Sequence, residues 1–349
     1  MASEFNLNCP TPISNYDKIL LGHGSGGKLT SELIKNIFLP AFENPYLAEL
    51  GDQAVINLNG LKIAFTTDSY VVNPIFFPGG DIGELAVNGT VNDLAVGGAK
   101  PLFISAGFIL EEGFSISDLC KIVESMKKAC ARAGVILVTG DTKVVEKGKG
   151  DKIFINTSGI GIIEKEIEIS PRKVKPGDKI LINGPIGLHG IAILSKREGI
   201  EFEVEIESDT APLNSLVEDI LSVSENIHWM RDPTRGGVSS ALNELAQSAK
   251  LGVEIWESEI PIPEPVKAAC EMLGLDPLYV ANEGKLIAVV SNEDAEKVLE
   301  AMRANPLGKE AQMIGEITDE HPSVVLMKTL VGGKRVVDML AGEQLPRIC

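Results

Sequence analysis

Apolar and polar residues follow one another along the chain with two periods, two in some segments and about 3.6 in others. The period of two over residues 53–58 and 61–68, separated by an Asn-Gly pair, predicts a β-hairpin. Residues 115–134 show the helical period, with a serine and an aspartate at the start and Gly134 at the end. These are the usual residues at the two ends of a helix, so we expect an amphipathic helix there.

The rest of the first half continues in the same way. Residues 1–45 are expected to form a polar N-terminal arm with a short helix near residues 29–42. After the first hairpin, the pattern predicts a helix over 81–100 and a buried strand over 101–110. It also predicts a second hairpin, formed by residues 135–145 and 152–164.

The second half repeats the mixture of strands and helices. Strands are expected at 180–187, 201–207, 252–257 and 286–290, and helices at 189–198, 213–225, 264–274 and from the Pro-Thr-Arg-Gly-Gly stretch of residues 233–237 onward. A charged stretch with two prolines around residues 165–179 separates the halves. We therefore expect an α+β fold of two α/β domains, 46–168 and 169–337, followed by a mobile tail, 338–349.

Composition limits the partners of such a protein. The 349 residues carry a formal net charge of −17, which disfavours nucleic acid because the sequence has no basic patch. The N-terminus lacks the layout of a signal peptide, and no apolar run approaches the ~18 residues that cross a membrane. We expect a cytoplasmic protein without a membrane partner. The cysteines, at positions 9, 120, 130, 270 and 349, are too scattered for a disulfide framework or a zinc site.

The glycine-rich stretch 22–29 resembles the opening of a phosphate-binding P-loop. A P-loop would continue after Lys28 with serine or threonine, whereas this chain has Leu29. The stretch can still be a flap whose backbone N–H groups and Lys28 cover phosphates, since glycines allow close approach to a polyanion. The alternative is a linker.

Several aspartates lie at the ends of apolar strands or beside glycines. Singly such residues are common turn or cap residues, but together they are typical of magnesium ligands that bridge to phosphates. The set is Asp52, Asp68, Asp93, Asp141 and Asp232. Arg235, followed by two glycines at a predicted helix start, suits an anion. The period of two places Asp141 and Lys143 on one face of a strand.

The chain ends in Cys349, which is in the wrong position for prenylation. A thiol on a terminal tail can carry a group into a site elsewhere. The motifs follow one another in the order glycine-rich stretch, "NDLAVGGA", "GDTKVV", "RDPTRGG", "NEGK" and terminal "PRIC". In these motifs and their order, the sequence resembles the HypE family of hydrogenase maturation factors, the carbamoyl dehydratases. That family lies within the PurM-like superfamily of aminoimidazole ribonucleotide synthetase relatives.

The resemblance implies a PurM-like homodimer whose first-domain strands form a shared barrel, with ATP and Mg²⁺ between the domains. It implies that a carbamoyltransferase, HypF, loads Cys349 with a carbamoyl group, which ATP-dependent dehydration turns into a thiocyanate. The cyano group would pass to iron on a HypC–HypD complex, as a ligand of the nickel–iron centre.

The resemblance also assigns residues. Magnesium would be held by the five aspartates named above, and the nucleotide would be bound by His23, Gly26, Gly27, Lys28, Asp68, Asn92, Asp93, Gly140, Asp141, Thr142, Asp232, Arg235, Gly236 and Gly237. Cys349 is the carrier. From the chemistry of dehydration we assign Glu283 as the base and Lys143 as the cation that stabilises the transferring group; the alternative for Glu283 is a surface turn residue.

Two other functions fit parts of the sequence. A selenophosphate synthetase belongs to the same superfamily but has cysteine or selenocysteine beside the glycine-rich loop, where this chain has His23. A non-catalytic adaptor that docks partners through its C-terminal peptide would leave the aspartates and glycines without a role.

Overall fold

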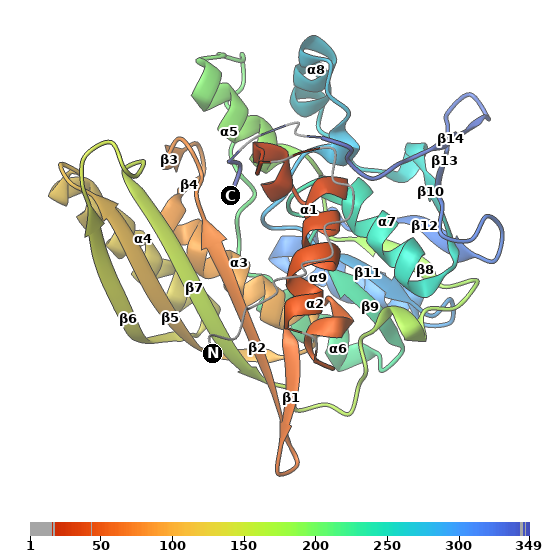
Figure 1. Cartoon of the computed structure of the whole chain (residues 1–349). Helices are drawn as coiled ribbons and strands as arrows, with labels where there is room; N and C mark the ends of the chain where they lie inside the picture. Colours follow the sequence, from red (N-terminus) through yellow and green to blue (C-terminus); the bar gives the residue numbers. More distant parts are fainter. Residues whose placement is uncertain (1–15, 17, 43, 343–344, 346) are drawn as a thin grey trace, which may run out of the picture.

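The structure is a computed structural model that describes residues 16, 18–42, 44–342, 345 and 347–349. Two mixed sheets dominate it (Figure 1), and each is built from one half of the chain. The first contains β1 (Ala54–Leu58), β2 (Leu61–Tyr70), β7 (Ile153–Ile162), β5 (Lys100–Glu111) and β6 (Ile136–Val145), in that spatial order. An α+β fold with two α/β halves is thus confirmed.

One face of the first sheet is covered by helices, and among the described residues no helix covers the other. Helices α3 (Ile82–Val96) and α4 (Ile116–Ala133) pack on the covered face with side chains such as Tyr70, Ile104 and Ile155. The opposite face leaves large apolar side chains exposed, among them Phe65, Phe103, Ile109 and Ile160.

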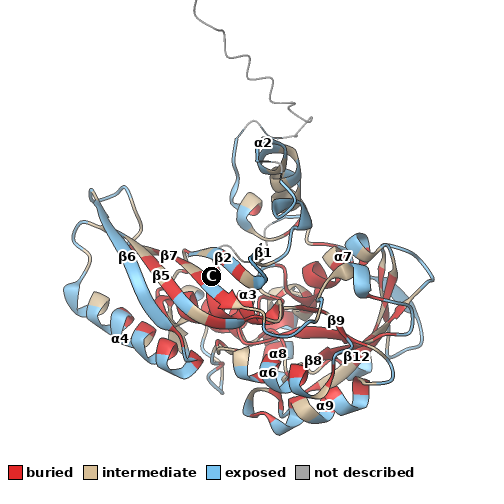
Figure 2. Ribbon diagram, turned by 90° about the horizontal axis from the view of Figure 1, so that it is seen from below, coloured by how far each residue is buried: buried red, intermediate tan, exposed pale blue. Residues whose placement is uncertain are grey.

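The second sheet is covered on both faces. Its strands, in spatial order, are β14 (Lys334–Val336), β13 (Val325–Lys328), β10 (Gly252–Trp256), β12 (Gln312–Thr318), β8 (Lys179–Ile182), β11 (Ile287–Val290) and β9 (Ile227–Arg231). Helix α7 (Gly237–Ala249) packs against one face, and α6 (Asn214–Val223) and α9 (Ala295–Ala304) pack against the other. Every residue of β11 is therefore buried. Figure 2 shows mostly buried residues in the same sheet at the strand labelled β9.

The remaining helices lie at the edges. Helices α5 (Leu188–Glu198) and α8 (Glu264–Leu273) share a small apolar cluster beside the second sheet, and a two-stranded ribbon is formed by β3 (Phe76–Phe77) and β4 (Gly80–Asp81). The predicted helix of the N-terminal arm is present as α1 (Lys28–Leu33), a π-helical turn (Ile34–Phe38) and α2 (Leu39–Ala41).

Most predicted elements are found, including the first hairpin and the helix over 115–134, whose Ser115 cap and left-handed Gly134 are as expected. The second hairpin is wrong. Strand β6 pairs in parallel with β5, and β7 lies between β2 and β5. The reason is that α4 carries the chain from β5 back to the start of β6, which is the crossover that a parallel pair requires.

Two further local predictions differ from the structure. Residues 201–207 alternate like a strand but form an irregular segment anchored by buried Ile206. Strand β9 and helix α9 were not predicted; β9 is short and carries polar His228 and Arg231, which interrupt its apolar pattern. In the described part of the chain, no helix is long and apolar enough to cross a membrane.

Candidate active site

Three of the five predicted aspartates meet where the two halves of the chain join. Asp52 precedes β1, Asp93 lies in the last turn of α3, and Asp232 follows β9. Each offers a carboxylate oxygen within 4.8 Å of the others. Three carboxylates so close together form a donor set that suits a hard divalent cation.

Neighbouring groups hold these carboxylates in place. The Thr66 hydroxyl on β2 donates to Asp93 Oδ2 at 2.9 Å. The Arg231 guanidinium pairs with Asp52 at 3.0 Å and with Glu244 of α7 at 3.2 Å. Neither Thr66 nor Arg231 was singled out from the sequence, because nothing in their local pattern points to partners so distant along the chain.

The three carboxylates resist ionisation while no cation compensates them. Burial raises the pKa of Asp93 well above its usual value, and the charges of Asp232 and Asp52 raise it further. Burial, together with Asp52, raises the pKa of Asp232 to about 7. A bound divalent cation would lower these pKa values by stabilising the ionised carboxylates, so the residues fit Mg²⁺.

Asp68 lies near this triad, whereas Asp141 does not. Asp68 is on β2, and its charge raises the pKa of Asp52, Asp93, Asp232 and Glu283. Asp141 is on β6, which lies three strand spacings, or about 14 Å, from β2. There its exposed carboxylate pairs with Lys143 at 2.7 Å, as the period of two predicts.

Gly140, Asp141, Thr142 and Lys143 therefore do not join the triad within one chain. Asp141 and Lys143 are opposite Gly107 and Ile109 of β5, and the exposed Ile109 side chain marks this as the uncovered face of the first sheet. The predicted roles of Asp141 at the metal and of Lys143 beside Glu283 therefore stay predictions, which would need a second copy of the chain.

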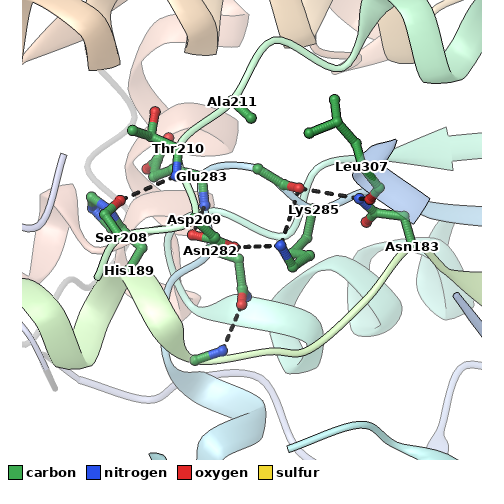
Figure 3. Close-up of polar contacts among 12 residues, drawn as sticks. Asn183, His189, Ser208, Asp209, Thr210, Ala211, Asn282, Glu283, Lys285 and Leu307 are labelled. Atoms are coloured by element: carbon green, nitrogen blue, oxygen red, sulfur yellow. Dashed lines mark hydrogen bonds and ion pairs between the residues drawn. The ribbon is translucent and has the colours of Figure 1, made fainter. Parts of the chain in front are cut away.

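Glu283 is buried beside the triad, with 2% of its surface exposed. Burial raises its pKa well above the usual value, as do the charges of Asp232 and Asp68, and Arg235 opposes them. Its Oε1 has no hydrogen-bond partner among the described residues. Figure 3 shows how the segment is fixed: Asp209 accepts from the Glu283 amide at 3.1 Å and pairs with Lys285 at 3.2 Å. The carboxyl can thus hold or release a proton toward the site.

Asn92 has a structural role here. Its side-chain NH₂ donates to the carbonyl oxygens of Ala211 and Glu283, and its Oδ1 accepts from the Leu213 amide. With its donors and acceptor occupied, Asn92 connects α3 to the second half of the chain. Its expected place in the nucleotide site stays a prediction.

The glycine-rich stretch packs against the start of α7. A side chain at Gly26 would meet Arg235, and one at Gly27 would lie 2.3 Å from the Leu340 carbonyl oxygen, so glycine is required at both positions. Gly236 and Gly237 begin α7 with left-handed φ values, as expected for a glycine pair before a helix.

The side chains of this stretch have other partners. Lys28 pairs with Asp338 at 2.8 Å at the surface, and the His23 ring accepts from the backbone amide of Leu20. In this structure both make contacts outside the acidic triad, so a nucleotide role for Lys28 and His23 stays a prediction.

The end of the tail is docked, although the sequence predicts a mobile segment. Cys349 accepts from the Val71 amide at 2.9 Å and lines a cavity of about 150 Å³ with Arg235, Gly24, Ser25 and Ser69. Burial raises the pKa of the Cys349 thiol to about 12; Arg235 opposes the rise, and Glu283 and Asp68 add to it. The terminal thiol is thereby inside the same site as the triad and Glu283.

Comparison with known proteins decides the family. The N-terminal and C-terminal domains of AIR synthase related proteins match residues 50–163 and 175–328. A carbamoyl dehydratase HypE from Cupriavidus necator is 53% identical over 351 residues, covering 100% of both chains. The chain belongs to the HypE family.

Solved HypE structures have the same fold. A HypE in complex with ATP is 49% identical, with a TM-score of 0.80 over 95% of this chain and 100% of that chain. A HypE–HypF complex matches with 50% identity and a TM-score of 0.84 over 88% of this chain and 99% of that chain. The resemblance read from the motifs is confirmed, and a selenophosphate synthetase is not favoured.

Proposed function

We propose that this HypE-family chain dehydrates a carbamoyl group carried on Cys349, at the expense of ATP, and so supplies cyanide ligands for a nickel–iron hydrogenase centre. The observation that carries the proposal is the position of Cys349: a C-terminal thiol docked in a cavity lined by Arg235, with Glu283 and Asp68 close enough to shift its pKa. The ATP complex of a relative 49% identical supports ATP as the co-substrate.

The chemistry requires the carbamoyl oxygen to leave. Transfer of the ATP γ-phosphoryl group to that oxygen makes it a leaving group, and its departure as phosphate with loss of both N–H protons leaves S–C≡N. Glu283 accepts one of these protons, since its raised pKa makes the ionised carboxylate a strong base, and the departing phosphate takes the other. Arg235, which lines the same cavity, stabilises negative charge on the transferring oxygens.

Asp52, Asp93 and Asp232 would hold Mg²⁺, with Asp68 nearby. The ion supplies charge neutralisation for the phosphates. Arg231 fixes Asp52, and Thr66 fixes Asp93, so both ligands are oriented before a cation binds.

A homodimer accounts for the position of Lys143. Asp141 and Lys143 lie on the uncovered face of the first sheet, together with exposed Phe103 and Ile109. A second copy packing its own uncovered face there would form the shared barrel and bury this apolar surface. Lys143 can then serve an active site only at the interface of the two copies.

The carbamoyl donor is HypF and the cyanide acceptor is a HypC–HypD complex. The solved complex of a relative with HypF supports the first assignment. The carrier thiol must leave the site to meet both proteins, and the extended segment from Asp338 to Cys349 spans at most ~40 Å, which is sufficient.

Glu283→Gln and Lys143→Ala test the assignment of the chemical step. Both variants should still accept the carbamoyl group from HypF and then dehydrate it slowly in a single turnover with ATP. A general base contributes roughly 10²–10⁴-fold. A slowing of less than about tenfold would remove Glu283 from that role.

A further inference from the structure

A buried ion pair lies beside Glu283. The Lys285 ammonium and the Asp209 carboxylate are 3.2 Å apart, and their side chains are only 10% and 3% exposed (Figure 3). Removing two charges from water costs free energy that their mutual attraction often fails to recover, and an apolar pair of similar volume is commonly as stable. Stability alone therefore does not account for a charged pair at this position.

The pair encloses the backbone of Glu283. Asp209 Oδ1 accepts from the Glu283 amide at 3.1 Å, and its Oδ2 pairs with Lys285, two residues further along the chain. Gly284 packs against the same segment, since a side chain there would lie 1.8 Å from the Asp209 carbonyl oxygen. The Gly284 carbonyl oxygen accepts from Asn183 at 3.2 Å. The backbone of residues 283–285 is thus held on both sides, whereas the Glu283 carboxyl keeps Oε1 without a partner among the described residues.

Asp209 is itself anchored through its two neighbours in the chain. The Ser208 hydroxyl is 2.8 Å from Nδ1 of His189 on α5, and Nε2 of the same ring is 2.8 Å from a carbonyl oxygen of the docked tail. On the other side, the Thr210 hydroxyl oxygen accepts from Nδ2 of Asn88 on α3 at 3.2 Å. Asp209 therefore has a fixed place relative to α3 and to the docked tail.

We propose that Asp209 and Lys285 are positioning residues for the base of the dehydration step: Asp209 holds the Glu283 amide, and Lys285 fixes the orientation of the Asp209 carboxylate. The inference rests on the proposed function, because it gives the pair a role in that step. Both residues lie outside the set that lines the thiol cavity, so they act through Glu283. Burial and the charges of Asp232 and Asp68 raise the pKa of Glu283, and the charge of Asp209 adds to them.

The test compares two double variants in which the buried pair carries no charge. Asp209→Leu/Lys285→Met removes the acceptor of the Glu283 amide, whereas Asp209→Asn/Lys285→Met keeps an oxygen that can accept from it. HypF loads each variant, and single-turnover dehydration with ATP is followed by peptide mass. We expect both variants to fold and to accept the carbamoyl group. Dehydration should be about 10–100-fold slower with leucine, because a small misplacement of a catalytic group is that costly, and within about fivefold of wild type with asparagine.

The control variant replaces an ion pair elsewhere. Lys179→Met/Glu316→Leu removes a partly buried pair between β8 and β12 and should leave dehydration unchanged. The wild-type chain in the same assay separates the two levels of the account. No dehydration by wild type would overturn the proposed function, and this inference with it. Wild-type dehydration together with a fast leucine variant would contradict only the role of the pair.

Equal rates in the two double variants would also overturn the inference, since the hydrogen bond to the Glu283 amide is what distinguishes them. If neither variant folds, hydrogen exchange of the wild-type chain decides. The Glu283 amide should exchange only when its segment opens, because it is bonded to Asp209. An amide that exchanges as fast as an exposed one would show that Asp209 does not hold it.

Discussion

At the scale of single residues, the site gathers acidic groups that would repel one another if all were ionised. Asp52, Asp93, Asp232 and Glu283 lie together, the first two half-buried and the last two buried, and each has a raised pKa. Such a cluster is tolerated because protons neutralise it in the free protein and a cation would neutralise it in the complex. The same groups disfavour a thiolate at Cys349, so the docked carrier is a neutral thiol.

Asp93→Asn should abolish magnesium-dependent ATP binding without harming the fold. The substitution removes one donor from the triad and also removes a buried group that repels Asp52 and Asp232. We therefore expect the melting temperature of the ligand-free protein to be equal or higher, and calorimetry to show no ATP binding with magnesium present. Normal ATP binding and hydrolysis by this variant would show that Asp93 is not a metal ligand. Asp319→Asn, an exposed site in the second half, is the control.

The docked thiol should react slowly with alkylating agents at neutral pH. Burial and the charges of Glu283 and Asp68 raise the pKa of Cys349 to about 12. Since the pKa is raised, docking is favoured while the thiol is protonated and is lost as the pH rises from the unfolded value of ~8.5 through about 12. The alkylation rate of Cys349 should climb about tenfold per pH unit between 7 and 9. A plateau below pH 9 would contradict this environment.

At the scale of elements, the connections between the two halves determine the site. Helix α3 supplies Asp93 and is fixed to the segments around Ala211 and Glu283 by the side chain of Asn92. The predicted helices and the first hairpin were correct because amphipathic period, caps and turn residues are local properties. The position of β6 beside β5 was not predicted, because strand order depends on how distant segments pack.

The same distinction applies to the site residues. Asp52, Asp93 and Asp232 could be predicted, since each stands beside a glycine-rich or strand-end pattern. Thr66, Arg231 and His189 could not be predicted, since their importance lies in contacts with residues far away in sequence. The sequence predicts that Lys143 and Asp141 share one face of a strand. The distance between Lys143 and Glu283 depends on the order of the strands in the sheet, which the sequence does not reveal.

Asn92→Ala should destabilise the protein by about 1–3 kcal/mol, because it leaves the buried Leu213 amide and the carbonyl oxygen of Glu283 without their partner. Urea unfolding measures the free energy of unfolding. ATP affinity should fall only to the extent that the segment around Glu283 is displaced. Asn226→Ala, whose side-chain bond to Asp294 is exposed, is the matched control and should change the unfolding free energy much less. Equal losses for the two variants would contradict the connecting role.

At the scale of the whole molecule, the described part of the chain leaves a broad face of the first sheet uncovered. The face of the first sheet opposite α3 and α4 carries exposed Phe65, Phe103 and Ile160, and β6 adds exposed Ile136 and Val138. An apolar surface of this kind, on an otherwise charged protein, indicates a partner surface. A second copy fits because it presents the same face and would bury both.

Val138→Asp on β6 should convert the proposed dimer to a monomer, since it places a charge within the apolar interface. Light scattering coupled to size-exclusion chromatography gives the mass. Val331→Asp is the control, because Val331 is 94% exposed at the turn between β13 and β14. If the Val138 variant remains a dimer, the interface lies elsewhere and Lys143 is not brought to a site in this way.

The carrier role of Cys349 is tested most directly by peptide-mapped mass analysis of the full-length chain after reaction with HypF and its carbamoyl donor, first without and then with ATP. We expect Cys349 to gain the mass of a carbamoyl group, and ATP with magnesium to remove one water from that adduct. We expect no adduct in Cys349→Ser. A donor-dependent mass gain that maps to Cys9, Cys120, Cys130 or Cys270, or a cyanated product from the serine variant, would contradict the carrier role.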